Sequence, residues 1–84
     1  MPLRGFTLEA EALAVFNRAA SRERVALLEV FDFLKQHPEE GFDSVVTDDV
    51  GRRLRVLHRG RFAIFWWEDL ADRRLRVVAL EELR

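Results

Sequence analysis

Arginine and aromatic side chains are concentrated in one stretch of the chain, Arg52 to Trp67, which reads RRLRVLHRGRFAIFWW. Apolar and charged residues alternate in its first half, a compact turn follows at Arg59-Gly60, and its second half is the densest aromatic run of the sequence. Guanidinium groups make bidentate contacts to phosphate or carboxylate, and aromatic rings stack on nucleobases. We therefore expect the binding surface of the protein in this stretch.

The distribution of charge supports an anionic partner, although the formal net charge of the chain is only −1. Residues 1–50 hold five Lys or Arg against ten Asp or Glu, whereas residues 51–84 hold nine Arg against five Asp or Glu. Such an asymmetry indicates that the basic half faces an anionic partner. The alternative is a solvated sheet face whose arginines stack over neighbouring aromatic rings.

Composition excludes several classes of site. The 84 residues suffice for one domain, which we take to span residues 1–84. Cysteine is absent, and the two histidines, His37 and His58, lack the spacing of a metal site, so we expect no disulfide, no metal and no cofactor. Neither an apolar signal region nor a run of about 20 apolar residues is present, which predicts a cytoplasmic protein without a membrane partner.

The first half of the chain shows helical spacing. A helix is predicted over residues 8–19, capped by Thr7, and a second helix begins at the cap residue Ser21 and ends at His37-Pro38. The connection is so short that the two must form an antiparallel hairpin. Ahead of them, Leu3 and Phe6 either form a brief edge strand or pack against the core.

The second half shows the alternation of a sheet. Strands are predicted over residues 42–47, 52–57, 62–67 and 73–80. The predicted fold is therefore α+β, with an N-terminal antiparallel helical hairpin packed on one face of a three- to four-stranded antiparallel sheet.

The register of the central hairpin decides which residues face the helices. A three-residue loop at residues 58–60 pairs Val56 with Phe62, whereas a two-residue loop shifts the register and mixes the faces, so the longer loop is predicted. The predicted inward residues are Leu54, Val56, Phe62, Ile64 and Trp66. The predicted outward residues are Arg53, Arg55, Phe65 and Trp67.

The order of these elements, with the segments GRRLRVLHRGRFAIFWWED and RRLRVVAL, resembles the RelE/ParE toxin superfamily of type II toxin–antitoxin systems. The segments are similar to the family's basic strand, turn, G-x-[FY]-x-[IV]-x-[YW] strand, acidic turn and closing strand, and the resemblance extends from Phe6 to Leu80. It implies a RelE/ParE-like fold and a toxin that inhibits growth through translation, by cleaving ribosome-bound mRNA without a metal, or through DNA gyrase. It also implies a cognate antitoxin that covers the toxin in a hetero-oligomer.

The resemblance places the family's paired basic residues on Arg53 and Arg55. Their guanidinium groups would stabilise the charge that develops when a ribose 2′-OH attacks a phosphate. The family's next arginine falls on Ala63, with Arg61 as the nearest substitute, and the chain has no tyrosine for the C-terminal catalytic position. The catalytic residues are therefore unassigned beyond the candidates Arg53, Arg55 and Arg61, and enzyme activity is left open.

The residues predicted to bind nucleic acid or a partner are Arg53, Arg55, Arg61, Trp67, Arg74 and Arg76. Of these, Arg74 and Arg76 either extend the basic surface or dock an acidic antitoxin segment. We interpret His58 as a polar turn residue, and Glu68, Asp69 and Asp72 as turn formers. Two functions remain: a toxin that acts on translation or gyrase, and a non-catalytic binding module with the RelE fold and a degenerate active site.

Overall fold

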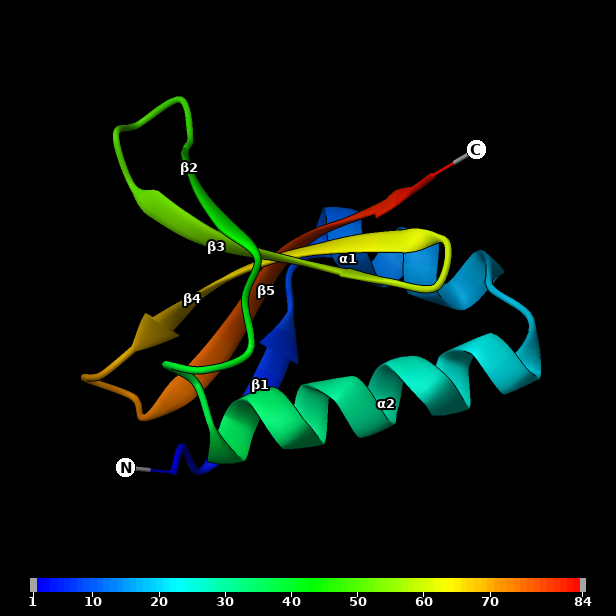
Figure 1. Cartoon of the computed structure of the whole chain (residues 1–84), viewed down its shortest axis with the longest axis horizontal. Coiled ribbons are helices and arrows are strands. Elements are labelled where there is room, and N and C mark those ends of the chain that lie inside the picture. Colours follow the sequence, from blue (N-terminus) through cyan, green and yellow to red (C-terminus); the bar gives the residue numbers. More distant parts are fainter. Residues whose placement is uncertain (1, 84) are drawn as a thin grey trace.

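The computed structural model describes residues 2–83. Arg84 therefore lies outside the described residues; it ends the segment in which the family's C-terminal catalytic position would fall. The elements follow in the order β1 (Gly5–Leu8), α1 (Ala10–Arg18), α2 (Ser21–Gln36), β2 (Ser44–Thr47), β3 (Arg53–Arg59), β4 (Phe62–Asp69) and β5 (Arg74–Glu82) (Figure 1). The predicted α+β class is confirmed. None of the helices within residues 2–83 has the length and apolar character needed to cross a membrane.

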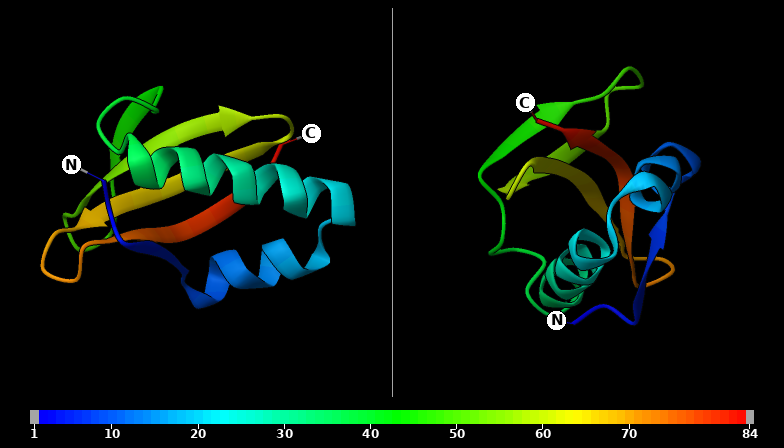
Figure 2. Two further views of the ribbon diagram at one scale, coloured as in Figure 1. Left: turned by 90° about the horizontal axis from the view of Figure 1, so that it is seen from below. Right: turned by 90° about the vertical axis from the view of Figure 1, so that its right-hand side faces the viewer.

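The sheet corrects the predicted three- to four-stranded antiparallel arrangement. It has five strands in the order β1-β5-β4-β3-β2, and it is mixed because β1 runs parallel to β5 while the other pairs are antiparallel. The segment from Gly5 to Leu8 is an edge strand, so the first predicted alternative holds for Phe6, whereas Leu3 precedes the strand and packs in the core. Both helices lie on one face of this sheet (Figure 2).

The strand β1 also moves the start of the first helix. Thr7, the predicted cap, is paired with Arg76 in the sheet, and α1 begins at Ala10 with Glu9 as its N-cap. The backbone N–H of Glu9 donates to the carbonyl of Val77 at 2.9 Å, so the backbone pairing with β5 extends to the helix start. Pairing with β5 satisfies backbone hydrogen-bonding groups that would otherwise form bonds within the helix. The strand therefore takes the place of the first turn of the predicted helix.

The second helix has the predicted length but a different cap. Its N-cap is Ala20, and the Glu23 carboxylate accepts a hydrogen bond from the Ala20 N–H at 3.0 Å. Ser21 is the first helical residue rather than the cap. The helix ends at Gln36, and His37 precedes Pro38 as its C-cap, as predicted from the restriction that proline places on the residue before it.

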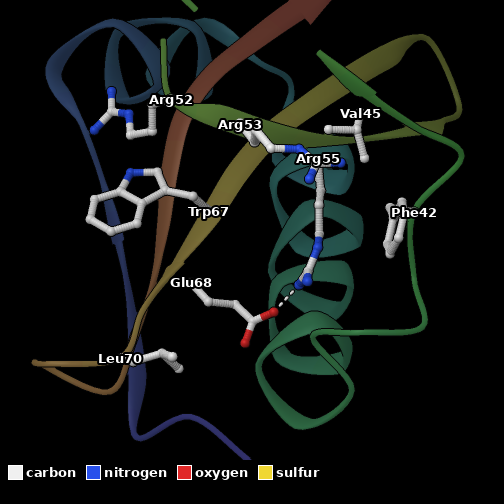
Figure 3. A pocket seen from close by; sticks show the side chains of 8 residues that line it. All are labelled: Phe42, Val45, Arg52, Arg53, Arg55, Trp67, Glu68 and Leu70. Atoms are coloured by element: carbon white, nitrogen blue, oxygen red, sulfur yellow. Dashed lines mark hydrogen bonds and ion pairs between the residues drawn. The ribbon is translucent and has the colours of Figure 1, made fainter. Parts of the chain in front are cut away.

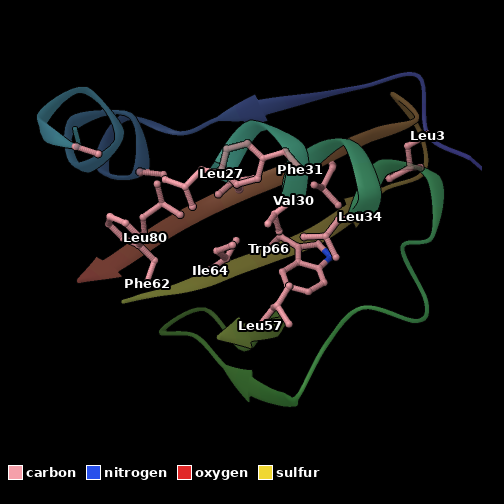
Figure 4. Close-up of a cluster of buried hydrophobic side chains, with 14 residues drawn as sticks. Leu3, Leu27, Val30, Phe31, Leu34, Leu57, Phe62, Ile64, Trp66 and Leu80 are labelled. Carbon is pink, nitrogen blue, oxygen red and sulfur yellow. The ribbon is translucent and has the colours of Figure 1, made fainter. Parts of the chain in front are cut away.

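The core lies between α2 and the central strands. Figure 4 shows Trp66 of β4 between Leu34 of α2 and Leu57 of β3. Trp66 and Leu34 are fully buried, which confirms the prediction that Trp66 faces the core. Burial of aromatic side chains of this size contributes several kcal/mol to folding, roughly 25 cal/mol for each Å² of apolar surface.

A β-bulge explains the uneven pattern of the last strand. Phe65 pairs with Ala79 and Trp66 pairs with Val77, so Val78 is the extra residue of β5. The extra residue shifts the alternation by one, and it lets both Val77 and Leu80 reach the core.

The central hairpin has a two-residue loop, and the predicted three-residue loop is wrong. Arg59 pairs with Phe62, and Leu57 pairs with Ile64. Gly60 has a positive φ of 59° at the first loop position, as in a type II′ turn. Paired residues share a face, so Arg55 lies on the helix-facing side with Trp66, whereas Val56 lies on the opposite side with Phe65.

The predicted faces are therefore correct for β4 and wrong for β3. Leu54 and Val56 are nevertheless buried, at 5% and 3% exposure, on the side away from the helices. Because β3 buries apolar residues on both faces, alternation alone could not identify the side that the helices cover.

Candidate functional site

An open pocket of about 480 Å³ lies where β3 separates from β4 (Figure 3). The paired part of the two strands starts at Arg55 opposite Trp66, and the residues before Arg55 on β3 diverge from those after Trp66 on β4 (Figure 1). The pocket is lined by Phe42, Val45, Arg52, Arg53, Arg55, Trp67, Glu68 and Leu70. Strand separation thus brings Arg53, Arg55 and Trp67 together although the register places them on different faces.

Arg55 is held by three contacts inside the pocket. Its Nη1 donates to the carbonyl oxygen of Pro38 at 2.7 Å and to Oε1 of Glu68. Its guanidinium carbon also lies 5.1 Å from the ring centroid of Phe42. Arg55 is therefore a fixed cation, neutralised by Glu68, that ties the ends of β3 and β4 to the chain that follows α2.

Arg52 is also engaged within the molecule. Its Nε donates to Oδ2 of Asp48 at 2.9 Å, and its guanidinium carbon lies 5.1 Å from the ring centroid of Trp67. Partial burial raises the pKa of Asp48, but hydrogen bonds from Arg52 and from the Val50 N–H outweigh this and leave the pKa below its ordinary value. Asp48 therefore balances the charge of Arg52 and fixes its position against Trp67.

Arg53 is the lining cation without an internal partner. Its side chain is exposed, and it makes no hydrogen bond, ion pair or ring contact within residues 2–83. Arg53 therefore supplies most of the positive charge in the pocket that an external anion could neutralise.

Arg61 does not join this pocket. It lies in the β3–β4 loop, where its Nε donates to Oε2 of Glu23 at 2.5 Å and its Nη1 donates to Oε2 of Glu82 at 3.3 Å. The hydrogen bond with Arg61 lowers the pKa of Glu23, and the Glu23 carboxylate in turn raises the pKa of Arg61. Its role in this structure is to tie the hairpin loop to α2 and to the end of β5.

The arginines of β5 are separate from the pocket as well. Arg76 donates from Nε to Oδ2 of Asp69 at 3.0 Å and from Nη2 to Oδ2 of Asp72 at 2.7 Å. A backbone hydrogen bond from Asp72 and the contact with Arg76 lower the pKa of Asp69. Arg74 lies next to β1, and its Nη1 donates to the carbonyl of Phe6 at 3.3 Å.

His58 lies in β3, not in the turn where the sequence placed it, and it does not line the pocket. Its backbone N–H donates to Oδ2 of Asp43 at 2.8 Å, which is the largest cause of a lowered pKa for Asp43. The His58 ring Nδ1 lies 3.3 Å from the same oxygen. Within residues 2–83, no cluster of three or more His, Cys, Asp or Glu side chains could hold a metal ion.

Sequence reasoning missed several residues of the pocket. The sequence predicts Glu68 in a turn, but β4 continues to Asp69 and brings the Glu68 carboxylate to Arg55. Phe42 and Val45 come from the segment after α2, and only the pairing of β2 with β3 places them there. The one signal in the sequence for a role of Glu68 in the site was its position directly after the two tryptophans.

Comparison with family models, curated proteins and solved structures finds no match to this chain. The arrangement of the pocket therefore carries the argument for function. It combines an arginine that has no partner among the described residues with two fixed arginines, a carboxylate and aromatic side chains.

Proposed function

We propose that the protein is a toxin of the RelE/ParE type that inhibits translation by binding single-stranded RNA in the pocket between β3 and β4. The observation that supports this most is the meeting of Arg53, Arg55 and Trp67 in one open pocket. Basic grooves with aromatic side chains bind single strands by charge and by base stacking. The proposed site of action is the cytoplasm, and the proposed partner is an antitoxin whose acidic segment would cover Arg53.

The second candidate is a non-catalytic binding module with the same fold. It is favoured by the chemistry of the pocket, where Glu68 is the one lining side chain able to act as an acid or base, and Arg55 binds its carboxylate. General acid–base cleavage normally needs a second group to protonate the leaving oxygen, and His58 does not line the pocket. RNA cleavage is therefore an outcome to be measured, separate from RNA binding.

The test is induced expression in bacteria, with growth, protein synthesis and DNA supercoiling followed separately. Wild type should arrest growth and reduce protein synthesis, and the double variant Arg53→Ala/Arg55→Ala should relieve the arrest at equal protein levels. The matched control is Arg4→Ala/Arg22→Ala, which removes the same charge from exposed positions outside the pocket.

Each readout decides between the candidates. Arrest that persists in the Arg53/Arg55 variant would rule out the pocket as the effector site. Altered supercoiling with normal protein synthesis would identify gyrase instead of translation. Harmless expression of wild type would favour the binding module, and the product of a neighbouring gene that co-purifies with it would then be its expected partner.

A further inference from the structure

Glu68 is out of place in a site that binds only phosphate. The pocket has one carboxylate among its arginines, and the Glu68 side chain is 19% exposed. A carboxylate repels phosphate unless the ligand offers hydrogen atoms that the carboxylate can accept. A ligand that binds beside Glu68 should therefore carry N–H donors as well as a phosphate.

The neighbours of Glu68 hold it in a fixed position. Arg55 contacts Oε1 of Glu68 and is itself anchored to the carbonyl of Pro38 and against Phe42. The carboxylate retains further lone pairs, and within residues 2–83 Arg55 is its only hydrogen-bond or ion-pair partner. Figure 3 shows the Glu68 carboxylate in the space between Arg55, Trp67 and Leu70.

The nucleobases differ in how well they fit such an acceptor. The Watson–Crick edge of guanine has two adjacent donors, N1–H and the N2 amino group, which match the two oxygens of a carboxylate. Adenine and cytosine have one amino donor beside an acceptor nitrogen, and uracil has one N–H between two carbonyl oxygens. Unstacked bases of single-stranded RNA expose this edge to proteins.

We propose that Glu68 makes the pocket selective for guanine in single-stranded RNA, with the base edge on Glu68, the base against Trp67 and Leu70, and a phosphodiester on Arg53. This assignment rests on the proposed RNA-binding function and adds the base that the site reads. Arg55 acts as a positioning residue that orients Glu68.

The test measures binding of labelled nonamers U4-X-U4, with X as G, A, C or U, by fluorescence anisotropy at fixed salt. Wild type should bind the G oligomer about tenfold more tightly than the U oligomer, the typical discrimination of a good bidentate base contact. Glu68→Gln should reduce that ratio to about twofold or less, because the amide has an NH2 donor group in place of one acceptor oxygen. Arg53→Gln should weaken binding of all four oligomers and leave the ratio unchanged.

Glu81→Gln, an exposed change outside the pocket, is the matched control and should preserve the ratio. Thermal unfolding of Glu68→Gln shows whether loss of the contact with Arg55 has unfolded the protein. If the variant is unfolded, the affinities of wild type for 5′-GMP and 5′-UMP are compared by competition instead. Equal competition by the two nucleotides overturns the proposal. Equal binding of the four oligomers by wild type overturns guanine selection but leaves RNA binding intact. Absence of binding to any oligomer overturns both proposals.

Discussion

Individual arginines in this protein differ in their availability, and ion pairing decides which of them can contact a ligand. Arg55, Arg61 and Arg76 each contact a carboxylate, whereas Arg53 contacts none within residues 2–83. An arginine that must leave an internal partner loses that contact before it gains a new one. A basic surface counted from the sequence therefore overstates the charge available to a partner.

The Glu23–Arg61 ion pair makes a prediction about pH at the same scale. Since the hydrogen bond with Arg61 lowers the pKa of Glu23 in the folded chain, protonation in acid favours the unfolded chain. The stability from this pair should be present at neutral pH and should fall as the pH drops below about 4. Glu23→Gln should lower the melting temperature at pH 7, and its difference from wild type should shrink as the pH falls below about 4.

Glu29→Gln provides the control, because Glu29 is exposed on the same helix and has no ion pair within residues 2–83. Some acid destabilisation should remain in Glu23→Gln, because the pKa values of Asp43, Asp48 and Asp69 are also lowered in the folded chain. A difference between wild type and Glu23→Gln that stays constant with pH would contradict the assigned role of this pair.

The elements show what alternation and helical spacing can predict. The extent of α2 followed from its apolar spacing and from Pro38, and four strands were found near their predicted positions. The register of the central hairpin did not follow, because β3 buries Leu57 on one face and Val56 on the other. The pocket depends on that register, on strand separation and on pairing between β2 and β3, all of which arise from contacts distant in sequence.

The connection between α2 and β2 makes a prediction at the scale of elements. A Cβ added to Gly41 would lie 2.6 Å from Cδ2 of Leu34 and 3.0 Å from Cε2 of Phe33, so the connection passes close to α2. Gly41→Ala should therefore destabilise the protein by about 1–3 kcal/mol through overpacking against the buried Leu34. Urea unfolding measures this change, and an unaltered midpoint would show that the connection does not pack against α2 as described.

At the scale of the whole molecule, the two helices and the sheet enclose one core, and the pocket lies at the corner of the sheet that they leave open. The connection after α2 supplies Phe42 and the Pro38 carbonyl, so α2 is linked to the site through Arg55. The fold thus fixes Arg55 in the pocket while it leaves the exposed side chain of Arg53 available to bind an anion.

The most direct test of the proposed function is cell-free translation of a reporter mRNA with purified protein added. Wild type should reduce reporter synthesis in proportion to its concentration, Arg53→Ala should require about tenfold more protein for the same inhibition, as expected for loss of one charge-assisted contact, and Arg4→Ala should match wild type. Equal inhibition by wild type and Arg53→Ala, or no inhibition by wild type, would contradict the proposal that this pocket acts on translation.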